Sequence, residues 1–436
     1  MHSKVLCVLL SICVGSLAFA GKPEITNNGT FYIYSFFWQN ADFNPDTEDG
    51  DQFFYMHADV GIMADFGAGV SSQVTLGGWG TFGKHPITGA GEECPSPGQD
   101  VAVREAYIDF AKLFDSPLSF RAGKMHVLQG EQVFDGGEDG VMGAKFYGST
   151  EMVDYDFAWY RLEENGGCWY VGAVSEVPDD VDLFGAWITG KFLEGAFRVA
   201  PYWFWRTTSG LMMIDTLEYV MKDDPMWLGG RLDVGPIAGL TVNGEFTMMM
   251  GQAEVVDVAD SEMKYKGMHA LGRLSYAPPT LPITFGGAYV MLTGDKVDTL
   301  AEYEAYESPI MGPYTFGFYK WWPGFGPAHV QTTAYGFSLV APFIDMMSTN
   351  LNVINANIGF HQGPFMLRGD FFMYSRNWVP DGVESDMGME IALLTTYTYR
   401  KTITLGATGG YWMPGDYFGD DLDPMLGGYL FTYITF

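Results

Sequence analysis

The sequence predicts a single transmembrane β-barrel of the up-and-down antiparallel type, in the all-β class. Three observations predict it: apolar and polar residues alternate with a period of two, the alternating runs are long, and tight turns alternate with long loops. The composition agrees, because 47% of the residues are hydrophobic, 16% are aromatic, only 17% are charged and 56 are glycine. Dispersed apolar residues among many aromatics and glycines are typical of transmembrane barrels.

The first 20 residues predict a secretory signal peptide. Lys4 supplies the basic region, residues 5–17 form the apolar stretch, and Ala18-Phe19-Ala20 is a small-x-small cleavage site. We therefore expect residues 1–20 to be removed and residues 21–436 to form the barrel. No later stretch reaches the roughly 18 consecutive apolar residues of a transmembrane helix.

The run 53–66 shows the alternation most clearly. Phe54 and Val60 lie on its apolar parity, whereas His57 and Asp59 lie on the other. Successive side chains of a strand leave opposite faces of the sheet, so one face suits lipid and the other suits water. Soluble strands usually have about 5–6 residues, whereas crossing a bilayer takes about 9–11. A long strand of a soluble sandwich is the alternative for this run alone.

The same pattern continues to the C-terminus. The alternation of tight turns with long loops loses phase around 176–225 and 294–364, so some of the expected runs are surplus, and we predict about 18 strands, with about 16 or 20 as alternatives. We expect the longest extracellular or plugging loops at 83–100, 207–225 and 294–328. The expected runs are 30–40, 53–66, 69–82, 101–111, 117–127, 138–149, 153–163, 168–175, 182–190, 194–206, 226–235, 240–251, 263–276, 281–293, 329–340, 350–361, 364–376, 385–398, 401–412 and 426–436.

Charged residues inside these runs predict a wet lumen. Lys or Arg on the lipid face costs about 2–4 kcal/mol near the bilayer midplane, and a barrel of about 16–18 strands encloses an aqueous channel. The basic candidates for lining the pore are Arg104, Arg121, Lys124, Arg161, Arg198, Arg206, Arg231, Arg273, Arg368, Arg376 and Arg400. The acidic candidates are Asp59, Asp65, Glu105, Asp109, Asp156, Asp233, Glu245, Asp370 and Glu390.

Partners and location follow from the two ends of the chain and from its charge. The last strand ends at Phe436 and looks like the signal read by the outer-membrane assembly machinery of Gram-negative-type bacteria. We expect the chain in that outer membrane, in contact with lipid and lipopolysaccharide and with a hydrophilic solute or polysaccharide. A net charge of −30 argues against nucleic-acid binding, which needs basic patches.

Catalysis and cofactors are not expected. The histidines stand in no Gly-x-Ser-x-Gly or His-Glu-x-x-His motif, so we do not expect an enzyme. Cys94 and Cys168 remain after signal cleavage and form a candidate disulfide in an oxidising compartment. Their spacing gives no metal signature, and we expect no metal and no cofactor.

Several short blocks resemble the alginate-export family of outer-membrane porins. Residues 104–110, followed by 113–124, resemble a strand–turn–strand hairpin of that family, although Lys124 stands where a second arginine is usual. Residues 134–141 are similar to its following loop and strand. Residues 292–295 and 410–416 resemble the residues before its long loop and its penultimate strand.

This resemblance implies a porin that passes an anionic polysaccharide such as alginate through a pore lined by basic residues and occluded by loops. The acidic candidates depart from that pattern. They leave open a general or cation-preferring diffusion porin with an acidic lumen, or a surface anchor or adhesin whose barrel is plugged. The aromatic loop 294–328 is expected either to plug the lumen or to stack on sugar rings.

Overall fold

The computed structural model describes residues 23–39, 51–83, 101–130, 134–135, 140–163, 181–214, 217–255, 262–296, 302–306, 308–309, 350–419 and 422–436. The expected signal peptide, Cys94 and Cys168 lie outside the described residues, as do most of the expected loops 83–100 and 294–328. In the described part of the chain no helix is long and apolar enough to cross a membrane.

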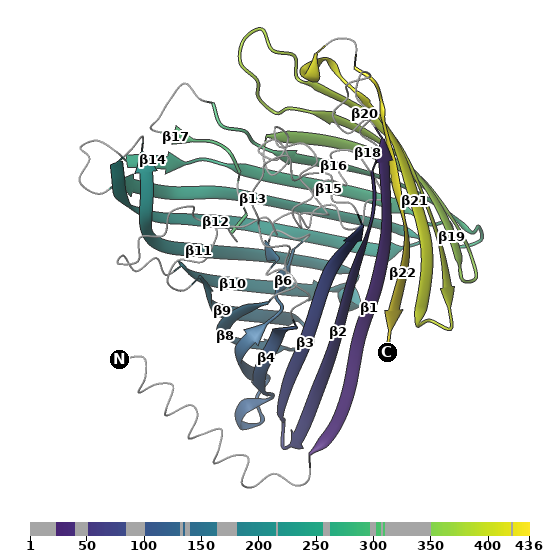
Figure 1. Ribbon diagram of the computed structural model, residues 1–436. Coiled ribbons are helices and arrows are strands. Elements are labelled where there is room, and N and C mark those ends of the chain that lie inside the picture. Colours follow the sequence, from purple (N-terminus) through teal and green to yellow (C-terminus); the bar gives the residue numbers. More distant parts are fainter. Residues whose placement is uncertain are drawn as a thin grey trace.

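The main architecture is a closed antiparallel sheet of 18 strands (Figure 1). This confirms the predicted strand number. Besides these 18, the short strands β6 (Leu128–Gln129) and β7 (Phe134–Asp135) pair with each other, β14 (Glu262–Tyr265) continues the pairing of β15 along β13, and β17 (Glu302–Tyr303) pairs in parallel with β14. The 18 strands are β1 (Glu24–Gln39), β2 (Asp51–Gly67), β3 (Val70–Gly83), β4 (Ala102–Phe110), β5 (Leu118–Met125), β8 (Val141–Ser149), β9 (Val153–Glu163), β10 (Val181–Phe192), β11 (Phe197–Ile214), β12 (Leu217–Ile237), β13 (Leu240–Val255), β15 (Met268–Tyr276), β16 (Ile283–Leu292), β18 (Leu351–Gln362), β19 (Phe365–Ser375), β20 (Asp386–Tyr399), β21 (Ile403–Pro414) and β22 (Met425–Thr435).

The first and last strands close the ring. β1 pairs with β22 from Thr30 opposite Thr435 to Gln39 opposite Leu426. Beyond that ladder, the amide of Gly29 donates to the Phe436 carbonyl at 2.9 Å, and the Phe436 amide donates to the Gly29 carbonyl at 3.1 Å. Closure removes the unpaired edges that an open sheet would leave in lipid.

Tight turns and long connections alternate around the ring. The end that carries the tight turns and both ends of the barrel chain is called the turn rim below, and the opposite end the loop rim. Turns at 67–69, 150–152 and 400–402 join strands at the turn rim. The surplus expected runs 168–175 and 329–340 fall outside the described residues.

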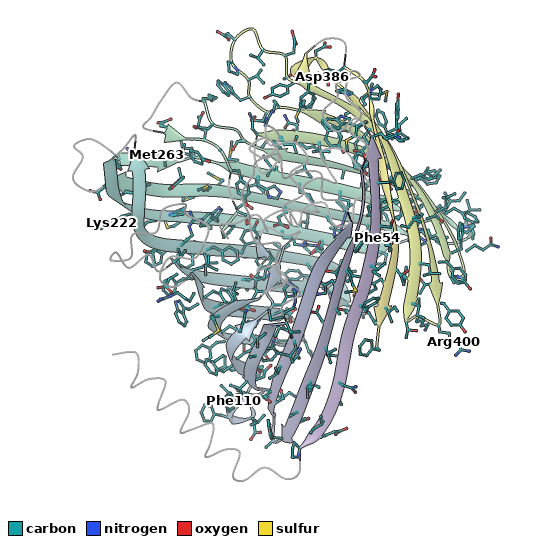
Figure 2. The ribbon with its side chains drawn as sticks, in the orientation of Figure 1. Phe54, Phe110, Lys222, Met263, Asp386 and Arg400 are labelled. Atoms are coloured by element: carbon teal, nitrogen blue, oxygen red, sulfur yellow. The ribbon has the colours of Figure 1, made fainter. Side chains whose placement is uncertain are left out.

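One expected loop is wrong. Residues 207–214 and 217–225 extend β11 and β12, which pair from Thr208 opposite Asp223 to Ile214 opposite Leu217. Lys222, labelled in Figure 2, pairs with Ser209 at the base of this extension and precedes Asp223-Asp224-Pro225, a stretch of turn-like composition. The two strands satisfy each other's backbone groups there, so this segment needs no apolar alternation to form.

The outer face is apolar, as the alternation predicts. Phe54, Val60 and Ile62 are exposed on β2, whereas His57 on the opposite parity is buried. Met387 departs from the alternation. It has the same parity as exposed Met389, which predicts an outward side chain, yet it is buried inside the barrel. The register of β19 with β20 shifts beside it, between Tyr374 and Ser375. An extra residue in one strand turns the following side chain to the other face.

The inner face has two zones, which the simple inside–outside pattern does not predict. Toward the loop rim it is apolar, and one buried cluster joins inward side chains of many strands to residues of the loops. Met125 and Val127 reach this cluster from the end of β5, and Tyr306 reaches it from the segment after β17. Its wall residues include Leu183, Phe204, Trp227, Met249, Leu292, Val353 and Phe372. Toward the turn rim the inner face is polar and charged.

Candidate functional site: the inner wall of the barrel

The first charged network lies on β4, β5, β8 and β9. Asp109 faces Arg121 across the β4–β5 pair, and Arg121 faces Lys145 across the β5–β8 pair. Arg121 Nε donates to Asp109 Oδ2 at 3.0 Å, and the Tyr147 hydroxyl donates to Asp109 Oδ1 at 2.7 Å. Lys145 Nζ lies 2.7 Å from Asp156 Oδ2. Two cations and two carboxylates therefore neutralise each other on this sector of the wall.

Aromatic rings frame the same guanidinium. Arg121 lies 4.2 Å from the centroid of the Tyr107 ring and 5.5 Å from that of Tyr147. Such contacts stabilise a cation beyond its ion pair. Only 24% of the Arg121 side chain and 17% of that of Lys145 remain exposed, so the network presents a limited charged surface to the lumen.

A second network lies on β12, β13 and β15. Arg231 Nε is 2.7 Å from Asp233 Oδ2, and its Nη1 is 3.6 Å from Glu245 Oε2. Asn243 links this pair to the next strand, because its amide donates to Asp233 Oδ1 at 2.6 Å and its carbonyl oxygen accepts from Arg273 Nη2 at 3.0 Å.

A third network lies on β18, β19 and β20. Arg368 Nη2 is 2.6 Å from Asp370 Oδ1, which also accepts a hydrogen bond from the Asn355 side chain at 3.0 Å. Also on β19, the Tyr374 hydroxyl donates to Oε2 of Glu390 on β20 at 2.8 Å. Glu390 is fully buried, so it stabilises the wall and is not presented to a solute.

The fourth network joins the first strands to β4. Asp59 Oδ2 lies 2.6 Å from His57 Nε2, and Asp59 Oδ1 lies 3.0 Å from Arg104 Nε. The neighbouring Glu105 accepts from Thr75 Oγ1 at 2.9 Å. Arg104 and Glu105 contact inner-wall residues despite being adjacent in sequence, because the register of β3 with β4 shifts between Thr75 and Leu76.

Several predicted pore residues lie elsewhere. Lys124 is on the parity opposite Arg121 and donates to the Val103 carbonyl at 2.7 Å. Arg161 stands opposite exposed Met142 on the outer face and pairs with Asp182 at 2.8 Å. Alternation excludes both side chains from the lumen wall.

Three more candidates lie at the turn rim. Arg400 is in the turn after β20, with its guanidinium 5.1 Å from the Tyr399 ring (Figure 2). Asp65 Oδ1 accepts from the Gly67 amide at 2.7 Å and so caps the β2–β3 turn. Arg198 Nε donates to the Gly195 carbonyl at 3.2 Å.

Arg206 and Arg376 lie in the apolar zone toward the loop rim. Both are buried, with their guanidinium groups 5.3 Å from the Trp227 ring and 5.0 Å from the Tyr417 ring. They pack the wall beneath the loops. Lys145 was missing from the predicted set, although it shares the parity of Tyr147 in run 138–149 and its position within the strand was sufficient to find it.

Two loop segments narrow the barrel from within. A Cβ built on Gly130, in the connection after β5, would lie 2.5 Å from Glu245 Oε1 on β13, far around the ring. The second segment, 302–306, is fixed by Thr293, whose hydroxyl donates to the Glu304 carbonyl at 2.6 Å and accepts from the Met268 amide at 2.8 Å. Of the loop 294–328, the described residues 302–306 contact the inner wall, and plugging of the lumen by the loop as a whole stays a prediction.

Tyr306 seals the contact between the second segment and the wall. It is 1% exposed, and its ring centroid lies 5.4 Å from that of His269 on β15. Beside them, Tyr202 bonds to Thr247 at 2.6 Å and to Glu245 at 3.1 Å. The segment thus rests on a polar network and not on apolar packing alone.

Comparison with known proteins supports the fold. No protein-family model matches the chain, and no curated protein does. Among solved structures, a BenF-like porin from Pseudomonas fluorescens Pf-5 is similar, with 11% identity and a TM-score of 0.56 over 94% of this chain and 98% of the other. Acinetobacter baumannii OccAB1 has 11% identity and a TM-score of 0.56, over 96% and 99%. Pseudomonas aeruginosa OccK2 (OpdF), in complex with glucuronate, has 8% identity and a TM-score of 0.55, over 94% and 98%.

These structures do not support the resemblance to the alginate-export family, because they are Occ and BenF-like porins. They share with this chain a barrel that spans nearly the whole of each protein. Together with the exposed apolar exterior, they show that the chain has the fold of an outer-membrane porin and belongs in the outer membrane.

Proposed function

We propose that this protein is a passive channel for small hydrophilic solutes. The observation that carries the proposal is the ring of hydrogen-bonded charged networks on the inner face of a closed barrel, toward the turn rim. Charged side chains at membrane depth need water or partners, and 18-stranded barrels enclose an aqueous path.

The paired charges favour weak ion selectivity. The cations of the four networks each lie beside a carboxylate or an amide oxygen, so the described part of the wall lacks the uncompensated basic surface that an alginate path would need. The apolar zone toward the loop rim also narrows the entry, which favours small solutes over a polymer chain.

A second candidate is a channel for carboxylated sugars. The OccK2 structure holds glucuronate, and Arg121 and Lys145 of this chain keep part of their side chains exposed on the inner wall. A carboxylate would have to compete there with Asp109 and Asp156, so this candidate requires that the ion pairs open.

Reconstitution of the full-length protein in a planar lipid bilayer tests the proposal. We expect stepwise ion conductance in potassium chloride and a small reversal potential in a salt gradient. A folded, heat-modifiable protein that inserts but carries no current would support the plugged anchor or adhesin instead. A strongly anion-selective current reduced by glucuronate would favour the second candidate.

A further inference from the structure

Five aromatic side chains form a continuous patch on the inner wall where β1 meets β22. This aromatic panel consists of Tyr32, Tyr34, Tyr429, Phe431 and Tyr433. Tyr32 stands directly opposite Tyr433, and Tyr34 directly opposite Phe431, in the ladder that closes the barrel. Directly opposed residues of two strands point to the same face of the sheet.

The panel faces the lumen. The other parity of β22 carries Leu426 and Leu430, which are 47% and 57% exposed on the lipid side. Tyr32 stacks at 4.5 Å on His57, a fully buried residue of the inner-wall network. The panel lies near the turn rim, within ten residues of the end of β22, away from the apolar cluster that the described residues form toward the loop rim.

The rings form a connected surface. Tyr34 and Phe431 lie 5.8 Å apart with planes 28° from parallel, and Tyr32 and Tyr433 lie 6.0 Å apart with planes 25° from parallel. Tyr429 meets Tyr34 at 5.4 Å and Phe431 at 5.8 Å. Each ring contacts at least one ring on the same or the neighbouring strand, so the panel is continuous across both strands.

Gly406 on β21 makes room for the panel. A Cβ at this position would lie 2.1 Å from Phe431 Cζ and 2.3 Å from Phe431 Cε1. The Phe431 ring therefore leans over the backbone of β21 and extends the panel toward a third strand.

Exposure distinguishes the panel from the packed core. Core rings such as Phe372, Tyr374 and Trp227 are 0–1% exposed. Tyr433 is 36% exposed, and the other four panel rings are only partly buried. Aromatic rings left partly open to a water-filled path are available to a passing solute.

We infer that the panel is a binding surface for the ring of a saccharide, most simply a neutral pyranose. A pyranose has an apolar C–H face that packs on aromatic rings, and hydroxyl groups that exchange hydrogen bonds with phenol hydroxyls. No Asp, Glu, Lys or Arg belongs to the panel, so recognition there needs no charge on the solute. This inference rests on the proposed channel function and names its solute class.

Current block by maltotriose in planar bilayers tests the inference. We expect maltotriose to reduce the current of the full-length protein in a saturable way. The double substitution Tyr34→Ala/Phe431→Ala should raise the half-blocking concentration on the order of tenfold or more, as expected for loss of ring stacking, while open conductance is kept or increased. Tyr34→Phe retains the ring and should keep most of the block.

The matched control is Tyr397→Ala/Tyr411→Ala on β20 and β21, whose side chains are 45% and 43% exposed on the outer face. It should leave the block unchanged, and heat-modifiable migration checks that each variant folds. Equal half-blocking concentrations for the panel variant and the unaltered protein would overturn the inference, as would a conducting channel that maltotriose does not block. A folded protein without any current would overturn the proposed function instead.

Discussion

Gly130 holds the first loop segment against the far wall of the barrel. Its φ is +71°, a conformation that side-chain-bearing residues rarely adopt. A Cβ would also meet the Glu245 carboxylate, a residue that the Arg231 network and Tyr202 hold in place. Backbone conformation and contact therefore both require glycine here.

Replacing Gly130 by alanine should displace this segment from Glu245 and raise single-channel conductance. Gly382 provides the control, because its φ is +85° but nothing lies within 4 Å of its Cβ position. Gly382→Ala carries a similar backbone strain without the collision. Equal conductance changes in the two variants would show that the contact with Glu245 does not set the pore width.

Asp109 controls the charge balance of the first network. Asp109→Asn should shift the reversal potential in a salt gradient toward anion preference, because Arg121 and Lys145 then outnumber the remaining Asp156. Arg121→Gln should shift it in the opposite direction. Asp115→Asn in the exposed turn before β5 removes the same charge outside the lumen and should leave the reversal potential unchanged.

Residue-level prediction from sequence succeeds where alternation is regular. Arg368 and Asp370 are two residues apart and lie on one face, as parity requires. Arg121 and Lys124 are three residues apart and cannot share a face of a regular strand. Parity therefore allows only one of these two candidates to line the pore. Arg104 and Glu105 could not be assigned in this way, because the shift of register between β3 and β4 is invisible to parity.

At the scale of elements, the segment 302–306 is the part of a long connection that is tied to the wall. The Lys266 amide donates to the Tyr303 carbonyl at 2.8 Å, and the Glu304 amide donates to Asp295 Oδ1 at 3.0 Å. At its exposed start, hydrogen bonding to Lys266 lowers the pKa of Glu302. Two of these bonds are made by Lys266, just before β15, and the third by Asp295, which follows the end of β16 close to Thr293.

Thr293→Val removes both hydroxyl bonds with little change of shape, so the segment should detach more often. We expect faster proteolytic cleavage next to 302–306 and noisier, larger currents. Thr284→Val, at the turn-rim end of the same strand, alters a hydroxyl that bonds only weakly, at 3.5 Å to His361. Cleavage at the same rate in both variants would contradict a latch at Thr293.

Strands could be predicted from sequence and loops could not. Alternation of apolar and polar residues predicts a strand. The extensions of β11 and β12 beyond Thr207 are instead stabilised by pairing with each other. Twenty expected runs exceeded the predicted strand number, and only the lost alternation of short and long connections indicated that some were surplus. The contact between Gly130 and Glu245 joins positions far apart in sequence and leaves no local pattern.

For the whole molecule, net charge and lumen charge are different quantities. The chain carries −30, with a sequence pI of about 4.3, yet the inner networks pair acids with bases. The overall acidity therefore predicts the behaviour of the exterior and not the selectivity of the channel. The two zones of the inner wall could not be predicted from sequence either, because the apolar residues on the inner face are explained only by the loop residues that pack on them.

Acidification should make the charge of the lumen wall more positive. Carboxylates ordinarily take up protons near pH 4, whereas arginine and lysine stay charged. Lowering the pH from about 7 to about 4 should therefore shift the reversal potential toward anions. A shift toward cations would contradict the paired-network description.

The buried cluster that joins loop segments to the upper wall also limits how this protein can diversify. Surface loops generally vary in sequence and tolerate insertions. Here the stretches around Val127 and Tyr306 are part of the buried apolar cluster. Grafting foreign sequence into them would therefore expose apolar side chains of the wall. Antigenic variation and engineered insertions should therefore be tolerated at the tip of the β11–β12 hairpin and excluded from those two stretches.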